Sequence, residues 1–182
     1  LPLVGPMDLL KPTRVNHLGK LAFDACNAAL ADAGLDPAQE DPDRIGTTMG
    51  TALGGVAHGE AQYRNFLLEG PRAVDPALAL TVFAGASSCN IAIEFGFTGP
   101  NSTNGMSCAS GAIAIGEGFR AIARGEADVM VSGGAEAPLA PLCFGAFAII
   151  IAVSQAIGSE EIDDYSGLGR RSHGLRRRLG CG

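Results

Sequence analysis

Apolar residues recur every three or four positions in two separate parts of the chain, and this spacing predicts amphipathic helices. The first segment runs from His17 to Ala33, and Gly34 follows it where a glycine commonly ends a helix. The second runs from Ala109 to Arg124 and stops before a glycine as well. We therefore expect both segments to be helical and to pack their apolar faces against another layer.

Three shorter patterns lie between these two helices. Residues 44–50 combine β-branched and small side chains and predict a short strand that runs into the turn Gly54-Gly55. Residues 58–69 have the composition of a further helix. Residues 76–95 carry almost no charge, which predicts one long helix that is buried on most sides.

Two more extended segments enclose the second amphipathic helix. Residues 101–107 are small and polar and follow the break Gly99-Pro100, and residues 128–132 read as a buried strand closed by Gly133-Gly134. A strand, a helix and a strand in this order form a βαβ unit, which requires parallel strands covered by helices. The fold class predicted from the pattern is therefore α/β.

Composition narrows the class of protein. The chain has 182 residues, of which 47% are hydrophobic, enough for one domain with a buried core. No apolar run reaches the length of a membrane span, and no secretory signal is visible. The net charge of -6 argues against nucleic-acid binding. The five cysteines include no CxxC pair, so we expect no disulfide framework, metal site or cofactor, and the cytoplasm as the location.

The two ends of the chain differ from its middle. The sequence does not begin with Met, which suggests a piece of a longer protein. After Ser154 the periodic pattern stops, and residues 155–182 carry charges of both signs with the basic run Arg176-Arg177-Arg178. We expect residues 1–154 to be a partial domain, and residues 155–182 to be a disordered tail or one introduced by a frameshift.

Cys108 is the residue that suggests chemistry. It lies where the predicted strand turns into the predicted helix, and a helix N-terminus favours the thiolate form that acts as a nucleophile. Small neighbours leave the sulfur accessible, as in a nucleophile elbow. A small buried packing residue is the alternative reading. That reading is favoured for the other four cysteines, Cys26, Cys89, Cys143 and Cys181.

The segment around Cys108 also carries a family resemblance. Met106-Ser107-Cys108-Ala109-Ser110-Gly111, preceded by Gly99-Pro100-Asn101 and followed by Gly133-Gly134-Ala135-Glu136, resembles the N-terminal half of the chain-elongating β-ketoacyl-acyl-carrier-protein synthases. The motifs keep the family's order and spacing over roughly residues 8 to 150, which makes them more specific than any single pattern.

The resemblance implies a thiolase-like fold, of which this chain holds one incomplete βαβαβ half layered with helices. It implies an acyltransferase of fatty-acid biosynthesis, in which Cys108 holds the acyl chain as a thioester and its backbone N–H contributes to the oxyanion hole. Malonyl-carrier protein is then decarboxylated, and the carbanion extends the chain in a Claisen condensation. Leu53 matches a position that gates the acyl pocket, and Leu78 matches one that lines it.

The resemblance also implies partners. Acyl-carrier protein is acidic, and Arg14 and Arg72 lie at positions where such synthases present basic residues to it. Residues 101–106 correspond to the strand that pairs with its counterpart across a homodimer interface. No nucleic acid and no membrane is expected as a partner.

Departures from the family pattern limit the expected activity. Decarboxylation in the family needs two histidines from the second half, and His17, His58 and His173 do not match them. We expect the isolated chain to be inactive and, because apolar surface is left uncovered, marginally stable or aggregation-prone. A thiolase or polyketide relative and a catalytically dead fragment remain alternatives. A chain-length subunit would lack the cysteine, so Cys108 opposes that alternative.

Overall fold

The computed structural model describes residues 16–157, which fall into two compact units divided after Pro138. The first unit holds a small sheet with five α-helices in its described part. In the second unit the described helix is α6 (Pro141–Ile157), formed by the apolar run that begins at Pro141.

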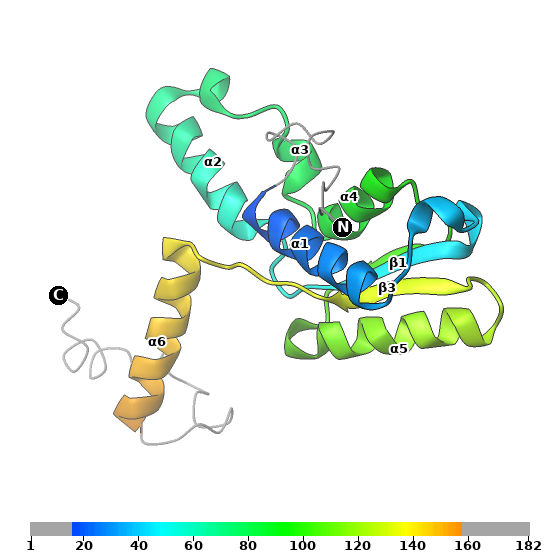
Figure 1. Cartoon of the computed structure of the whole chain (residues 1–182). Helices are drawn as coiled ribbons and strands as arrows, with labels where there is room; N and C mark the ends of the chain where they lie inside the picture. The colour runs from blue at the N-terminus through cyan, green and yellow to red at the C-terminus, as the bar shows by residue number, and fades with distance from the viewer. Residues whose placement is uncertain (1–15, 158–182) are drawn as a thin grey trace. The chain divides into compact units, whose positions relative to one another are not determined.

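The sheet has three parallel strands, as the βαβ pattern predicted (Figure 1). They are β1 (Ile45–Gly50), β2 (Asn101–Asn104) and β3 (Val129–Gly134), in the order β2-β1-β3. In the register, Thr47 lies opposite Asn101 on one side and Val131 on the other. The central strand is therefore the first one in the sequence, and the carboxyl ends of all three strands lie at the same edge.

The helices agree with most of the sequence predictions. Three helices form where they were predicted: α1 (His17–Asp32), α2 (Val56–Glu69) and α5 (Ser110–Ala123). A fourth, α4 (Ala86–Phe95), covers only the second half of the helix predicted over residues 76–95. Short 3₁₀ helices cover Pro37–Gln39, Pro42–Arg44, Pro71–Ala73 and Ser107–Ala109.

Local chemistry explains where α1 begins and ends. The Asn16 side chain accepts a hydrogen bond from the Gly19 backbone N–H at 2.8 Å, which satisfies one of the donors that a helix N-terminus leaves open. At the other end, Gly34 has φ +64°, a left-handed conformation that favours glycine. The predicted helix and its glycine stop are confirmed.

The prediction of one long buried helix over residues 76–95 is wrong. The segment forms two helices, α3 (Leu78–Thr81) and α4, separated by residues 82–85. The break fits the loop after β1, because a Cβ on Gly55 would lie 2.5 Å from the Thr81 carbonyl oxygen and from Val82 Cα. Burial is also incomplete, since Ile93 on α4 is 72% exposed. Backbone packed against backbone at this site replaces the continuous helix that propensity alone favours.

Two strand predictions need smaller corrections. The extended segment ends at Asn104, and Ser107 already belongs to a 3₁₀ turn. The strand predicted at 128–132 forms as β3, but its residues are half-buried, with Gly134 exposed. In the described part of the sheet β3 is an edge strand, so it lacks a neighbour on one side.

The two faces of the sheet are packed differently. One face carries α1 and α4 through large apolar side chains, where the ring of Phe95 stacks on Phe23 and Phe97 at 5.3 Å between centroids. The other face carries α5, as Figure 1 shows. Alternation along β1 separates the two, because Ile45 and Met49 belong to the core cluster whereas Gly50 faces α5.

Candidate active site around Cys108

Cys108 lies in a sharp turn between β2 and α5. Its 3₁₀ turn, Ser107–Ala109, runs directly into Ser110, the first residue of α5. Ser107 has φ +52°, the one left-handed non-glycine residue among residues 16–157. Such a conformation is uncommon for serine and marks a tightly constrained turn. The Cys108 side chain is exposed, so its sulfur is accessible at the point where the sequence predicted a strand-to-helix transition.

Glycines bring the start of α5 onto the carboxyl ends of the strands. A Cβ on Gly50, at the end of β1, would lie 2.2 Å from the Ser110 carbonyl group. A Cβ on Gly134, at the end of β3, would lie 2.8 Å from Gly111 Cα. Since the neighbouring atoms are backbone, a side chain at either position requires the helix to move. The glycines therefore fix where the turn that carries Cys108 sits.

Asn104 ties the same turn together. Its side-chain amide donates to the Ser110 carbonyl oxygen at 3.1 Å, and its side-chain oxygen accepts from the Met106 N–H at 3.4 Å. Its backbone oxygen accepts from the Thr51 N–H at 3.1 Å, which extends the pairing of β1 and β2. One residue thus holds β1, the Cys108 turn and the first turn of α5 in a fixed relation.

The surroundings of the Cys108 sulfur contrast with those of a core thiol. The first backbone N–H groups of a helix have no partner inside the helix and favour negative charge nearby. Cys108 lies at that end of α5. Cys26, by comparison, is buried in α1, and burial raises the pKa of its thiol from 9.0 to about 12. Cys26 is a packing residue, as predicted, whereas Cys108 is exposed at the start of α5.

Leu53 lies in the loop that follows β1, at the same edge of the sheet as Cys108. The loop is held by Glu136, whose Oε2 accepts hydrogen bonds from the Thr51 hydroxyl at 3.2 Å, the Leu53 N–H at 2.8 Å and the Ala52 N–H. Sequence reasoning included Glu136 in the family motif but assigned it no role. Its place directly after β3, next to the end of β1, is the signal that could have revealed it.

Leu78 lies in α3, whose C-terminal end contacts the same loop. The Leu78 carbonyl accepts from the Val82 N–H at 3.0 Å, and Val82 in turn is in close contact with Gly55. Leu78 is half-buried and Leu53 is 37% exposed. The structure thus joins the elements that carry Leu53, Leu78 and Cys108 through the loop after β1.

Arg72 is placed away from this group. It is exposed in the 3₁₀ helix at the far end of α2, and α2 has 14 residues, which corresponds to a length of about 20 Å. Figure 1 shows α2 leading away from the sheet. Arg14 lies outside the described residues, as do His173 and Cys181.

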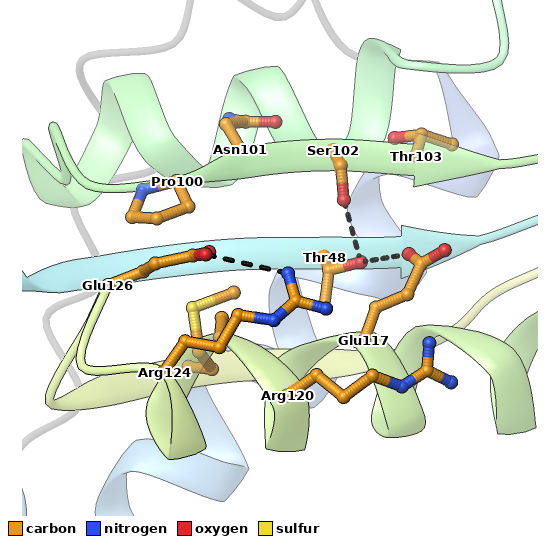
Figure 2. A pocket seen from close by; sticks show the side chains of 11 residues that line it. Thr48, Pro100, Asn101, Ser102, Thr103, Glu117, Arg120, Arg124 and Glu126 are labelled. Atoms are coloured by element: carbon orange, nitrogen blue, oxygen red, sulfur yellow. Dashed lines mark hydrogen bonds and ion pairs between the residues drawn. The ribbon is translucent and has the colours of Figure 1, made fainter.

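A cavity of about 310 Å³ opens beside the edge strand β2, between the sheet and α5 (Figure 2). Most of the residues that line it are polar or charged. The Ser102 hydroxyl donates to Thr48 Oγ1 at 3.0 Å, and the Thr48 hydroxyl donates to the Glu117 carboxylate at 3.1 Å. Arg120 of α5 and Arg124, which follows α5, also line the cavity, and Arg124 forms an ion pair with Glu126 at 3.5 Å. The cavity lies beside β2 rather than at the Cys108 turn.

The described residues show neither a metal cluster nor a spanning helix. Within residues 16–157 no group of three or more His, Cys, Asp or Glu side chains is arranged to hold a metal ion. In the same part of the chain, no helix combines the length and the apolar character needed to cross a membrane.

Curated sequences show similarity over most of the chain. It is 32% identical over 148 residues to 3-oxoacyl-[acyl-carrier-protein] synthase 2 of Staphylococcus aureus, covering 81% of this chain and 37% of that protein. It is 34% identical over 148 residues to the enzyme of the same name from Synechocystis sp., covering 81% of this chain and 36% of the relative. The chain therefore spans little more than a third of the length of these relatives.

Solved structures give the same picture of the fold. A type II polyketide acyl-carrier protein in complex with its ketosynthase matches with a TM-score of 0.71 and 26% identity, over 78% of this chain and 42% of that one. The ishigamide ketosynthase/chain length factor matches with a TM-score of 0.69 and 30% identity, over 76% and 34%. These matches confirm the predicted thiolase-like α/β fold.

The family comparison covers the Cys108 turn, the glycine junction and the loop held by Glu136 together. The family described as "Beta-ketoacyl synthase, N-terminal domain" matches residues 8–169. The chain therefore belongs to the β-ketoacyl synthase family, as its sequence motifs predicted.

Proposed function

We propose that this chain is the acyl-accepting part of a 3-oxoacyl-acyl-carrier-protein synthase, an acyltransferase of fatty-acid biosynthesis. The observation that carries the proposal is the exposed Cys108, held at the start of α5 by a junction of glycine backbones. Membership of the family and the names of the curated relatives support it. We place the reaction in the cytoplasm.

The proposed reaction has two covalent steps. The Cys108 thiol gives up its proton, and the thiolate attacks the carbonyl of an acyl-carrier thioester. The carrier's sulfur leaves as a thiolate and takes up that proton, so that the acyl group becomes a thioester on Sγ. Malonyl-carrier protein then loses CO₂, and its carbanion attacks the Cys108 thioester. The new carbon–carbon bond forms as the Cys108 thiolate is released. N–H groups at the start of α5 stabilise the oxyanion in both attacks.

The second step needs groups that the family carries in its other half. The two histidines implied by the resemblance do not match any histidine of this chain. Since the chain spans little more than a third of its relatives, we propose that it supplies the acyl-holding step and that condensation requires the remaining part. We propose residues 1–154 as the partial synthase domain and residues 155–182 as a tail, although α6 continues to Ile157 and the family match extends to residue 169.

Leu53 and Leu78 are proposed to bind the acyl chain. Both are apolar, and the elements that carry them meet at the loop after β1. Leu53 lies at the same edge of the sheet as Cys108, where it gates the pocket, whereas Leu78 lines it. An alkyl chain transferred to an apolar site gains about 0.8 kcal/mol for each buried methylene group.

Acyl-carrier protein is the proposed partner, contacted by Arg14 and Arg72. A structural neighbour is a ketosynthase in complex with its acyl-carrier protein, which supports this class of partner. With a net charge of -6, the chain needs local basic residues to attract an acidic protein. Arg72 is exposed at the end of α2, where a protein as large as the carrier has access to it.

A homodimer through residues 101–106 is proposed as the assembled form. In the described sheet β2 is an edge strand, so one row of its backbone N–H and C=O groups is open for pairing with a second copy. The polar cavity beside β2 (Figure 2) offers room for side chains of the second copy. Sedimentation should give twice the monomer mass. Thr103→Pro removes an N–H that points to the open edge, because the Pro100 and Asn104 carbonyls on either side of it face β1, and it should reduce the mass to that of the monomer. A wild-type protein that stays monomeric at high concentration would rule this interface out.

The proposed acyl transfer is tested with a carrier protein that bears a radiolabelled fatty acyl chain. We expect label to remain on the wild-type chain and on Cys89→Ala, a matched variant at a half-buried cysteine of α4. Cys108→Ala should retain none, and Arg72→Glu should slow labelling. Label on Cys108→Ala would disprove the nucleophile assignment. A folded wild-type protein without label would favour the dead-fragment alternative.

A polyketide ketosynthase is the second candidate, because one structural neighbour is, by its title, the ketosynthase of a type II polyketide system. The chemistry at Cys108 would be the same, but the acyl group would carry carbonyl oxygens along its length. Labelling by a polyketide-type acyl carrier in preference to a saturated fatty acyl carrier would favour this candidate.

A further inference from the structure

Glu136 is an exposed carboxylate that makes an unusual number of hydrogen bonds to one short loop. A single oxygen, Oε2, accepts from the Thr51 hydroxyl, the Ala52 N–H and the Leu53 N–H. The Thr51 hydroxyl oxygen accepts in turn from the Gly54 N–H at 3.1 Å. Three consecutive backbone N–H groups of the loop are therefore satisfied by two side chains.

The anchor of this carboxylate is the sheet itself. Glu136 follows β3 by two residues, and the Ala135 N–H donates to the Gly50 carbonyl oxygen at 3.1 Å, which continues the pairing of β1 with β3. The loop begins at Thr51, directly after β1. Glu136 therefore connects two adjacent strand ends at the carboxyl edge, next to the start of α5.

The loop transmits its position to α3. Gly54, at φ +56°, packs against Ala84, and Gly55 packs against Thr81 and Val82. A Cβ on Gly54 would lie 2.9 Å from Ala84 Cα, so the loop has little room to shift without moving the segment after α3. The wall on which Leu53 sits is thus defined by one carboxylate and by close backbone contacts.

We infer that Glu136 is a positioning residue that fixes the Leu53 loop and so sets which acyl chain lengths reach Cys108. The inference rests on the proposed function, since it assigns Leu53 to the acyl pocket. The bonds to a carboxylate are charge-assisted and stronger than neutral ones. Without the carboxylate, two adjacent N–H groups lose their acceptor, and the loop adopts other positions to satisfy them with water.

The test uses irreversible alkylation of Cys108, which requires no carrier protein and no condensation. N-alkylmaleimides with short and long alkyl chains add their ring carbon to the thiolate sulfur, and the ring takes up one proton from water. Mass spectrometry of the Cys108 peptide gives the rate for each reagent on the full chain. The ratio of the long-chain rate to the short-chain rate reports whether the proposed Leu53 wall affects how a long alkyl chain reaches the sulfur.

We expect Glu136→Ala to change this ratio by about threefold or more, because the lost bonds shift the loop population. Glu136→Gln should stay closer to wild type, since its amide oxygen still accepts from two N–H groups. Asp36→Ala is the matched control, because Asp36 also holds a turn through its carboxylate, 3.1 Å from the Ala38 N–H, but before the amino end of β1. Its ratio should equal that of wild type.

Two results would overturn the inference. The first is a Glu136→Ala variant that has the wild-type circular dichroism spectrum and the wild-type ratio of rates. The second is a wild-type protein that reacts with the long-chain and short-chain reagents at the same rate. If Glu136→Ala fails to fold, the long-chain to short-chain ratio of Glu136→Gln is compared with that of Asp36→Ala. Equal ratios in these two variants would overturn the inference. Failure of the proposed acyl transfer would appear separately. The labelled acyl carrier would then transfer no label to the protein, while the alkylation ratios of the variants still differ.

Discussion

The two faces of the sheet are packed by different kinds of residue: large apolar side chains on one face, which we call the aromatic face, and glycines on the other, which we call the glycine face. On the face of α1 and α4, large side chains such as Phe23 and Ile91 are almost completely buried, at 1% exposed each. On the face of α5, glycines let backbone approach backbone, with Gly50 against Ser110 as the tightest contact. Aromatic packing stabilises through buried area, whereas glycine packing fixes position with little area.

The aromatic face therefore contributes most to the stability of the unit, whereas the glycine face fixes the position of α5 against the sheet. The aromatic face tolerates small displacements, because side chains can repack around a change in volume. The glycine face does not, because the contacting atoms belong to the backbone on both sides. The exposed Cys108 lies on the glycine face, just before the first residue of α5, and the buried Cys26 lies on the aromatic face.

The largest effect is expected from Phe23→Ala. Removing a buried ring that stacks on Phe95 should lower the free energy of unfolding by about 3–5 kcal/mol. Phe119→Ala on α5 is the matched control, because Phe119 is 71% exposed and should have little effect. Urea denaturation measures both. Equal losses in the two variants would remove the distinction between the faces.

Gly50→Ala should have a smaller effect on stability but a larger one on the site. We expect a loss of about 1–3 kcal/mol, since the new Cβ overlaps the Ser110 backbone and pushes α5 outward. The rate of Cys108 alkylation should change with it. Gly133→Ala in β3 has no atom within 4 Å of the added Cβ and serves as the control. An alkylation rate unchanged by Gly50→Ala would show that the glycine contact does not position Cys108.

The pH dependence of Cys26 gives the smallest effect near neutral pH, because it sets in only above pH 9. Burial raises its pKa from 9.0 to about 12, so above pH 9 the unfolded chain loses this proton while the folded chain keeps it. Ionisation then favours unfolding, and the stability that Cys26 contributes below pH 9 is lost as the pH rises toward 12. Wild type should lose about 1.4 kcal/mol per pH unit relative to Cys26→Ala over this range. Parallel pH curves for the two proteins would contradict the burial of this thiol.

Much of the aromatic face and of the strand pattern could be predicted from the sequence. Period and capping residues placed α1 and α5 within a few residues, and the βαβ order gave the parallel sheet. These features depend on local chemistry and on rules of connection that a sequence carries directly. The position of Cys108 between a strand and a helix could be predicted for the same reason.

The contacts of the loop after β1 could not be predicted in the same way. Nothing in residues 76–95 signals that the helix must break where Gly55 meets Thr81, because that contact joins segments far apart in the chain. The role of Glu136 depends on the neighbouring ends of β1 and β3, which become adjacent only in the folded sheet. A glycine can be recognised in the sequence, but the distant segment whose backbone it contacts cannot.

The strand order also has a consequence for synthesis and folding. The central strand β1 is made first, yet Ile45 pairs with Val129, and both neighbours of β1 come after it in the chain. Pairings so distant in sequence close large loops and form slowly. The turn at Cys108 cannot take its final place until Gly134 has left the ribosome, because that glycine contacts Gly111. A nascent chain interrupted before β3 would leave one edge of β1 unpaired, together with a free thiol at Cys108.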